Sequence, residues 1–184
     1  MKIIIEGIDR LGKDTLQSGI INTFGYHHVI HYSSPKNTNF YKNDDGFDEQ
    51  FWFQHDSFLN GFDLLEKDGK FIYNRFHLGE FVYSQRYRNY DGSYVFGIEK
   101  MFRRACQNVK LILLCTSNFD MMEDDGKSHD FSKRELEQAD FYKAFEMSHV
   151  EHKYKVDVAA SDGSGYRSRE SILDEVVTKL KNGD

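Results

Sequence analysis

A glycine-rich segment directly after the first apolar run constrains this chain more than any other feature. Residues 2–6 (KIIIE) are short and β-branched and predict a buried strand. Residues 7–13 (GIDRLGK) fit the spacing G-x-x-x-x-G-K, and residues 13–23 predict a helix. Glycines let such a turn curl so that successive backbone N–H groups point inward, and the helix start adds a partial positive charge. The chain therefore opens on a strand–loop–helix unit suited to holding an anion.

This context is the one that the P-loop, a phosphate-binding motif, requires. We expect the ATP-binding loop to comprise Gly7, Ile8, Asp9, Arg10, Leu11, Gly12, Lys13, Asp14 and Thr15. Lys13 would place a point charge on the β- and γ-phosphates. A Ser or Thr normally follows the lysine and binds Mg²⁺ through its hydroxyl, whereas Asp14 and then Thr15 follow here. These two are our candidate magnesium ligands, although Asp14 could instead favour the helix N-terminus through its charge.

Apolar runs and helical patterns alternate through the rest of the chain. Further strands are predicted at residues 28–32, 71–74, 109–115 and 154–159. Helices are predicted at residues 49–67, 78–87, 92–106 and 133–152, and from residue 168 onward. Such alternation is typical of parallel strands joined by right-handed crossovers. We therefore expect an α/β fold of the three-layer P-loop NTPase type, with about five parallel strands and helices on both faces of the sheet. We expect residues 1–184 to form a single domain.

Charge and composition argue against several classes of partner. The formal net charge is −6, whereas a protein that binds a nucleic acid polymer usually carries a basic face, so we expect no such partner. No apolar run approaches the ~18 residues of a membrane span. The two cysteines, Cys106 and Cys115, form no disulfide pattern and indicate a reducing compartment. We therefore expect a cytoplasmic protein without a membrane partner. No N-K-x-D or L-S-G-G-Q motif is present, which argues against a GTPase and a transporter ATPase.

Three segments of the chain resemble the thymidylate kinase group of nucleoside monophosphate kinases. Residues 6–13 (EGIDRLGK) resemble that family's E-G-x-D-R-x-G-K, and residues 74–83 (NRFHLGEFVY) resemble its D-R-[YFH] segment, which ends in an aromatic. Residues 34–36 (SPK) are similar to its F-P-x-R loop. The order and spacing hold from residue 1 to about residue 90. Phage-encoded deoxynucleotide kinases also carry P-loops like residues 12–15 (GKDT), in which case the location would be the host cytoplasm.

The resemblance implies a transferase of nucleotide biosynthesis that transfers the γ-phosphate of ATP to a deoxynucleoside monophosphate. The expected cofactor is Mg²⁺, and dTMP is the first-choice acceptor. Lys13, Arg10 and Arg75 would be the catalytic set, with Arg10 spreading transition-state charge. Asp9 would accept a hydrogen bond from the sugar 3′-hydroxyl, and Arg75 would grip the monophosphate at the end of the third strand. Lys36 is a second candidate for that phosphate.

The resemblance also places the base and the lid. Phe53 and Tyr83 are the candidates for stacking on the base, with Trp52 close behind, and one of Gln54, His55 and Asp56 would hydrogen-bond its edge. Residues 123–135 occupy the place of the family's lid, in which Lys127, Lys133 and Arg134 could close over the phosphates.

One position departs from the resembled pattern. The family usually has Asp before the strand-end arginine, where it orders the waters of Mg²⁺, but this chain has Asn74. Together with Asp14, this suggests that the carboxylate near the metal has moved from the third strand to the P-loop.

Two alternatives remain open. A deoxynucleoside kinase would phosphorylate the 5′-hydroxyl and needs a carboxylate base, and such enzymes show Glu-Arg-Ser where residues 74–76 read NRF. A non-catalytic nucleotide-binding module is the other. The preferred base and the oligomeric state are left undecided. A homodimer could form through the apolar face of residues 51–65, or that face could be buried within one chain.

Overall fold

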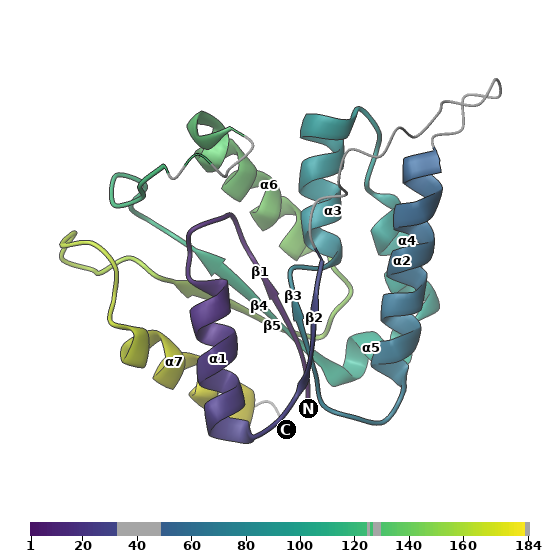
Figure 1. Cartoon of the computed structure of the whole chain (residues 1–184), viewed down its shortest axis with the longest axis horizontal. Coiled ribbons are helices and arrows are strands. Elements are labelled where there is room, and N and C mark those ends of the chain that lie inside the picture. Colours follow the sequence, from purple (N-terminus) through teal and green to yellow (C-terminus); the bar gives the residue numbers. More distant parts are fainter. Residues whose placement is uncertain (33–48, 125, 127–129, 183–184) are drawn as a thin grey trace.

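The fold is built on one parallel sheet between two layers of helices (Figure 1). The computed structural model describes residues 1–32, 49–124, 126 and 130–182. The sheet has the order β2-β3-β1-β4-β5, and its strand pairs are all parallel. The strands are β1 (Lys2–Glu6), β2 (His28–His31), β3 (Phe71–Asn74), β4 (Val109–Cys115) and β5 (His152–Asp157). The predicted α/β class, with five parallel strands and helices on both faces, is confirmed.

Helices cover both faces of the sheet. In Figure 1, α1 and α7 lie side by side on one face, and α2 to α6 cover the other. The helices are α1 (Lys13–Phe24), α2 (Glu49–Glu66), α3 (His77–Tyr83), α4 (Tyr94–Met101), α5 (Arg103–Asn108), α6 (Arg134–Met147) and α7 (Arg169–Asn182). Two short segments complete them, the π-helix η1 (Ser84–Arg88) and the 3-10 helix η2 (Phe131–Lys133).

The core lies where the three central strands meet both helical layers. β4 is buried along its whole length, and Ile3, Ile4 and Ile5 of β1 have no exposed surface. Burial of each such side chain contributes about 1.5–3 kcal/mol relative to leaving it in water. This explains why both strands read as continuous apolar runs rather than alternating ones. Cys106 and Cys115 are free and buried.

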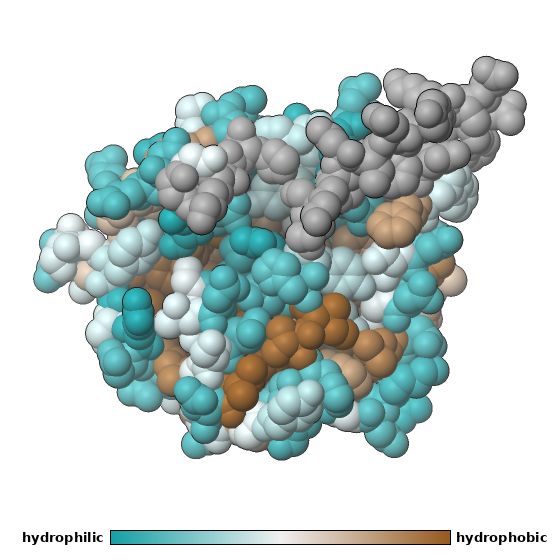
Figure 2. Space-filling view, viewed as in Figure 1, coloured by the Kyte–Doolittle hydropathy of each residue, from teal (hydrophilic) through white to brown (hydrophobic). Residues whose placement is uncertain are grey.

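The edge strand β2 is covered less completely than the central strands. Val29 of this strand is 41% exposed. In the space-filling view a hydrophobic strip interrupts a largely hydrophilic face over β2 and the end of α1 (Figure 2). By contrast, Phe58, Phe62 and Leu65 of α2 are buried within the chain. The apolar face predicted for this helix is therefore largely used in the monomer's own core.

Three predicted helices differ from the structure by more than one residue at an end or by a break. The helix predicted at 133–152 ends at Met147, because the next two residues turn to bond a buried carboxylate, that of Glu99. The segment 92–106 is two helices that meet at Phe102. The segment 78–87 changes from α-helix to π-helix at Ser84. Among the described helices, none combines the length and the apolar content needed to cross a membrane.

Candidate active site

The loop between β1 and α1 has the tightly curled backbone that its glycines predict. Gly7 has a φ of 131°, and a Cβ there would lie 2.3 Å from the carbonyl oxygen of Leu114 in β4. Only glycine fits this position without strain. Arg10 and Gly12 also have left-handed φ values, 76° and 80°, and α1 begins directly after them. The N–H groups at the start of α1 therefore face the hollow of the loop, where an anion is stabilised.

Lys13 lies inside this curl. Its side chain is buried, and Nζ donates hydrogen bonds to the carbonyl oxygens of Gly7 at 2.7 Å and Ile8 at 2.6 Å. Burial, followed by the nearby charge of Arg75, lowers the pKa of Lys13 to about 8, against the opposing pull of Asp9. These bonds hold the Lys13 ammonium group beside the loop, where phosphate oxygens would stabilise its charge.

Arg75 joins the carboxyl end of β3 to the loop. Its backbone has a φ of 64°, and its N–H donates to Ile5 O at 2.9 Å. One guanidinium nitrogen, Nη2, donates to Asp9 Oδ1 at 2.8 Å, and Nη1 lies 3.0 Å from His31 Nε2. Partial burial and the Arg75 charge lower the pKa of His31, which favours the neutral ring as the acceptor. The strand-end cation therefore points toward the P-loop, as the sequence predicts.

Glu6 fixes the corner between β3 and α3. Its carboxylate is fully buried at the end of β1, and Oε1 accepts from the backbone N–H groups of Phe76 at 3.0 Å and Leu78 at 2.9 Å. Burial raises its pKa. The sequence motif alone assigns this residue no role. The available signal was an acidic residue ending an otherwise apolar strand, which is costly unless N–H groups or cations meet it.

A pocket opens on the far side of the loop from α1. The P-loop contributes Asp9, the strand end contributes Arg75, and α3 contributes Tyr83. Its apolar wall includes Phe58 of α2, against which Tyr32 stacks at 5.2 Å. Burial and the charge of Asp9 raise the pKa of Tyr83, so its hydroxyl stays neutral. The pocket therefore combines a cation near the loop with a flat aromatic wall.

Gln54 of α2 adds a buried polar group to the wall of this pocket. It is 6% exposed, and we find no hydrogen bond from its amide to another residue in the described part of the chain. An amide offers an acceptor and donors side by side, which suits the edge of a base. Of the three candidates for this contact, only Gln54 lines the pocket, since His55 packs on Tyr94 and Asp56 is exposed.

A buried carboxylate, that of Glu80, also lines the pocket. Glu80 accepts hydrogen bonds from Arg88, Tyr90 and Tyr94, the last at 2.9 Å. Arg88 reaches back to Glu80 from the π-helical turn η1, and both residues line the pocket. π-Helical turns of this kind often occur at functional sites. The charge of Arg88 is thus balanced before any ligand enters.

Several predicted site residues lie elsewhere. Phe53 is 61% exposed and Trp52 is 45% exposed, and neither side chain lines the pocket. The side of α2 that faces the pocket carries Gln54 and Phe58, which are one helical turn apart. In this structure Phe53, the predicted stacking residue, therefore does not line the pocket. Lys36 and Lys127 lie outside the described residues.

The predicted lid cations that the structure describes lie near α6. Lys133 pairs with Asp130 at 3.1 Å, and the Arg134 guanidinium lies over the Phe131 ring at 4.6 Å. Neither residue lines a hollow beside the P-loop. They flank the site rather than closing it.

A second hollow, of about 610 Å³, lies on the α1 side of the loop. Arg10, Gly12 and Thr15 line one side of it, and the segment 166–173 before and within α7 lines the other. Tyr166 donates its hydroxyl hydrogen to Arg10 O at 3.2 Å. The sequence predicted the first wall but not the second, because Gly163 and Gly165 indicate a turn and nothing more. The P-loop thus separates two pockets.

One of the two candidate metal residues, Asp14, meets Asn74 where the end of β3 lies beside α1. Asn74 is buried, and its Nδ2 donates to Asp14 Oδ1 at 2.6 Å and to Gln17 Oε1 at 2.8 Å. Within the described residues, no group of three or more His, Cys, Asp or Glu side chains is placed to hold a metal ion. Oxygen donors such as Asp14 fit Mg²⁺, provided that phosphate oxygens complete its shell.

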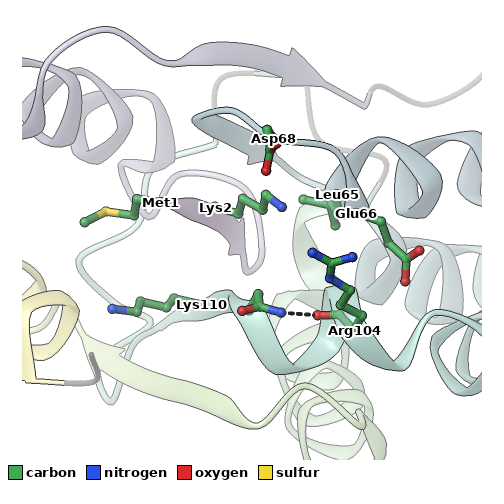
Figure 3. Close-up of a pocket in the computed structure, with 8 residues that line it drawn as sticks. Met1, Lys2, Leu65, Glu66, Asp68, Arg104 and Lys110 are labelled. Atoms are coloured by element: carbon green, nitrogen blue, oxygen red, sulfur yellow. Dashed lines mark hydrogen bonds between the residues drawn. The ribbon is translucent and has the colours of Figure 1, made fainter.

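Another hollow lies at the opposite end of the sheet (Figure 3). It gathers Met1, Lys2, Glu66, Arg104 and Lys110 around the amino ends of β1 and β4. Lys110 turns away from its centre to donate to Leu180 O at 2.6 Å. In open α/β sheets ligands bind at the carboxyl ends of the strands, so this hollow is on the wrong side for the active site.

Solved structures of known proteins share this fold. YorR from Bacillus subtilis, described in complex with phosphorylated GDP, has a TM-score of 0.67 at 16% identity, covering 98% of this chain and 96% of that one. Thymidylate kinase from Ehrlichia chaffeensis has a TM-score of 0.57 at 17% identity, covering 98% of each chain. Deoxyadenosine kinase from M. mycoides, described with dCMP and dCDP bound, has a TM-score of 0.55 at 14% identity over the whole of both chains.

The sequence comparisons add no relative. No protein-family model matches the chain, and no curated protein matches it significantly. The likeness to these solved structures is therefore one of fold.

Proposed function

We propose that this protein is a P-loop kinase that transfers the γ-phosphate of ATP to a deoxynucleoside monophosphate, with dTMP the first-choice acceptor. One observation carries the proposal: Arg75 lies 2.8 Å from Asp9 of the P-loop, so a pocket with a cation at its mouth adjoins the phosphate-binding loop. Its aromatic wall and the buried amide of Gln54 suit a base, and Arg75 suits the phosphate of the same nucleotide. Two of the solved structures that share this fold are a thymidylate kinase and a deoxyadenosine kinase, which is consistent with this assignment.

The donor nucleotide would lie in the hollow between α1 and α7. Its phosphates would follow the curl of the loop, with Lys13 at the β- and γ-phosphates and Arg10 beside them. The acceptor would enter the pocket lined by Phe58 and Gln54 and place its phosphate at Arg75. The two phosphates would then meet at the loop, which is the geometry that in-line transfer needs.

The protein's role in the transfer would be to position charges. The acceptor phosphate is already ionised, so no strong general base is required, and the cations of Lys13, Arg10 and Arg75 would neutralise the developing charge. Mg²⁺ bound with ATP would supply further charge neutralisation, and Asp14 and Thr15 are the residues we expect to hold it. Lys133 and Arg134 lie beside the site in this structure, so they would have to move over the phosphates, together with Lys127, to form a lid that excludes water.

A coupled ADP-release assay tests the proposal. We expect ADP release from ATP with at least one of the four deoxynucleoside monophosphates, dTMP first, and none with thymidine. Arg75→Gln should raise KM for the monophosphate by about 10- to 100-fold, since it removes a charge-assisted bond worth ~1.5–3 kcal/mol. Arg104→Gln, at the opposite end of the sheet, is the matched control and should leave KM unchanged. Nucleotide binding without ADP release for any acceptor would instead indicate a non-catalytic module.

A deoxynucleoside kinase is the second candidate, and the position of Asp9 favours it. This carboxylate lies on the wall of the acceptor pocket and within 4.0 Å of Lys13, where it could take a proton from a 5′-hydroxyl. ADP release with thymidine but not with dTMP would support this candidate and contradict the first.

A further inference from the structure

A hydrogen bond joins the P-loop to the segment that leads into α7. Tyr166 Oη donates to the backbone oxygen of Arg10 at 3.2 Å, across 156 positions of the sequence. The chain leaves β5 and enters α7 beside α1, which brings this segment next to the loop (Figure 1). Tyr166 and Arg10 also line the same hollow on the α1 side of the loop. The hydroxyl therefore contacts the P-loop from outside the strand–loop–helix unit that forms it.

The backbone of Arg10 has a conformation that residues other than glycine rarely adopt. Its φ is 76°, in the left-handed region. Such a conformation persists only where the surrounding structure holds it. Tyr166 bonds the carbonyl oxygen of this residue, so it restrains the peptide plane that follows the strained angle. The direction in which the Arg10 side chain leaves the loop depends on that backbone.

The segment that carries Tyr166 is itself anchored. Tyr166 forms an isolated antiparallel bridge with Ala159, just after β5. The next residue, Arg167, donates through Nη1 to Asp157 O at 2.9 Å and to Glu175 Oε2 at 2.6 Å. These contacts tie the segment to the end of β5 and to α7. Tyr166 therefore reaches Arg10 from a fixed point of the fold.

The hydroxyl of Tyr166 is a suitable donor at neutral pH. Burial raises its pKa, and the opposing charge of Arg10 and the supporting charge of Glu123 are smaller influences. The hydroxyl thus keeps its proton and can donate it to the carbonyl oxygen. A neutral hydroxyl restrains the backbone of Arg10 without neutralising the charge of the guanidinium.

We propose that Tyr166 is a positioning residue that holds Arg10 in the orientation needed for phosphoryl transfer. This inference rests on the proposed kinase function, in which Arg10 lies beside the donor phosphates. Arg10 is the residue that meets the phosphates, and Tyr166 acts only through it. A cation that is already oriented stabilises the developing charge without reorganising during the reaction. Loss of the hydroxyl should therefore slow the transfer more than it weakens the binding of ATP.

Tyr166→Phe tests this role, because it removes the hydroxyl and keeps the ring. We expect kcat to fall by about 2- to 10-fold, the range that one neutral hydrogen bond supports, while KM for ATP stays within about 2-fold. Tyr154→Phe is the matched control, since its ring lies under Lys179 of α7, and it should keep both kcat and KM. Thermal melting shows whether each variant folds.

A double-mutant cycle with Arg10→Gln separates positioning from a general loosening of the loop. Arg10→Gln alone should lower kcat by about 100-fold or more. If Tyr166 acts through the guanidinium, adding Tyr166→Phe to Arg10→Gln should change kcat by less than about 2-fold.

The outcomes distinguish this inference from the proposed function. If the two substitutions reduce kcat independently, so that their effects multiply, or if Tyr166→Phe raises KM for ATP and leaves kcat unchanged, the inference is wrong while the proposed function stands. If the unaltered protein releases no ADP with any acceptor, the proposed function fails and the inference fails with it.

Discussion

Replacement of Glu99 by glutamine tests the network that holds α3, and with it Arg75, in place. Glu99 lies on α4 with no exposed surface and accepts from His77 Nε2 at 2.7 Å, Ser148 Oγ at 2.6 Å and His149 N at 2.7 Å. His77 is the first residue of α3, two positions after Arg75. One carboxylate therefore ties α3 to α4 and to the turn after α6.

The magnitude follows from the pKa of this carboxyl. Burial alone would raise it, but the hydrogen bonds from His77, His149 and Ser148 outweigh burial and lower the pKa from 4.5 to about 2. At ~1.4 kcal/mol for each unit of pKa, the ionised group contributes about 3 kcal/mol to the free energy of unfolding at neutral pH. Because the folded pKa is lowered, this stability is present above pH 4.5 and is lost as the pH falls toward 2.

Glu99→Gln keeps the shape of the side chain but turns one acceptor oxygen into a donor. We expect it to lower the melting temperature at pH 7 by about 6–12 °C, from the usual 2–4 °C per kcal/mol for a chain of this size. In urea titrations, the stability gap to the unaltered protein should close as the pH falls through the window between 4.5 and about 2. Glu123→Gln, at an exposed position, is the control and should melt with the unaltered protein. A Glu99→Gln melting temperature within 2 °C of the control, or a gap that does not change with pH, would refute the reasoning.

Three further predictions concern the loop and the acceptor pocket. Since the pKa of Lys13 is about 8, the affinity for ADP in EDTA should fall as the pH rises through that value. Lys13→Met should abolish both this pH dependence and turnover. Calorimetry in buffers of different ionisation enthalpy would detect the proton that Lys13 takes up when ADP binds. Gly7→Ala should strongly reduce soluble yield or melting temperature, because its Cβ would lie 2.3 Å from Leu114 O, whereas Gly97→Ala has open space and should not. Gln54→Leu should raise KM for the preferred monophosphate by about 10-fold or more while the melting temperature holds, since it removes a buried hydrogen-bonding partner of the base; equal KM values would contradict that role.

The elements that the sequence predicted accurately are those defined by local signals. β1, β3 and β4 begin and end where predicted, because each is a continuous apolar run bounded by turn residues or charge. The P-loop and the start of α1 also follow from local sequence, since the glycines at 7 and 12 allow backbone angles that other residues avoid. The position of Arg75 then follows from topology, because parallel strands bring their carboxyl ends to one edge.

The features that the sequence missed depend on contacts between distant segments. Nothing local ends α6 at Met147; Ser148 and His149 leave the helix to bond Glu99, about 50 positions earlier in the chain. The stacking candidate Phe53 differs from Phe58 only in which side of α2 faces the pocket, and that depends on how α2 packs against the sheet. The role of Glu6 requires the start of α3 to lie beside the end of β1.

The Arg75–Asp9 pair also bears on which acceptor the pocket favours. Before an acceptor binds, the guanidinium is held by the Asp9 carboxylate and lies close to the His31 ring. A phosphate dianion carries enough charge and oxygen atoms to take Arg75 from Asp9, which would free that carboxylate to accept a hydrogen bond from the sugar. A nucleoside hydroxyl offers no such charge, so the ion pair would persist and Arg75 would contribute little to its binding. A guanidinium placed at the mouth of the pocket therefore favours a nucleotide over a nucleoside, and this is the physical reason for ranking the monophosphate kinase first.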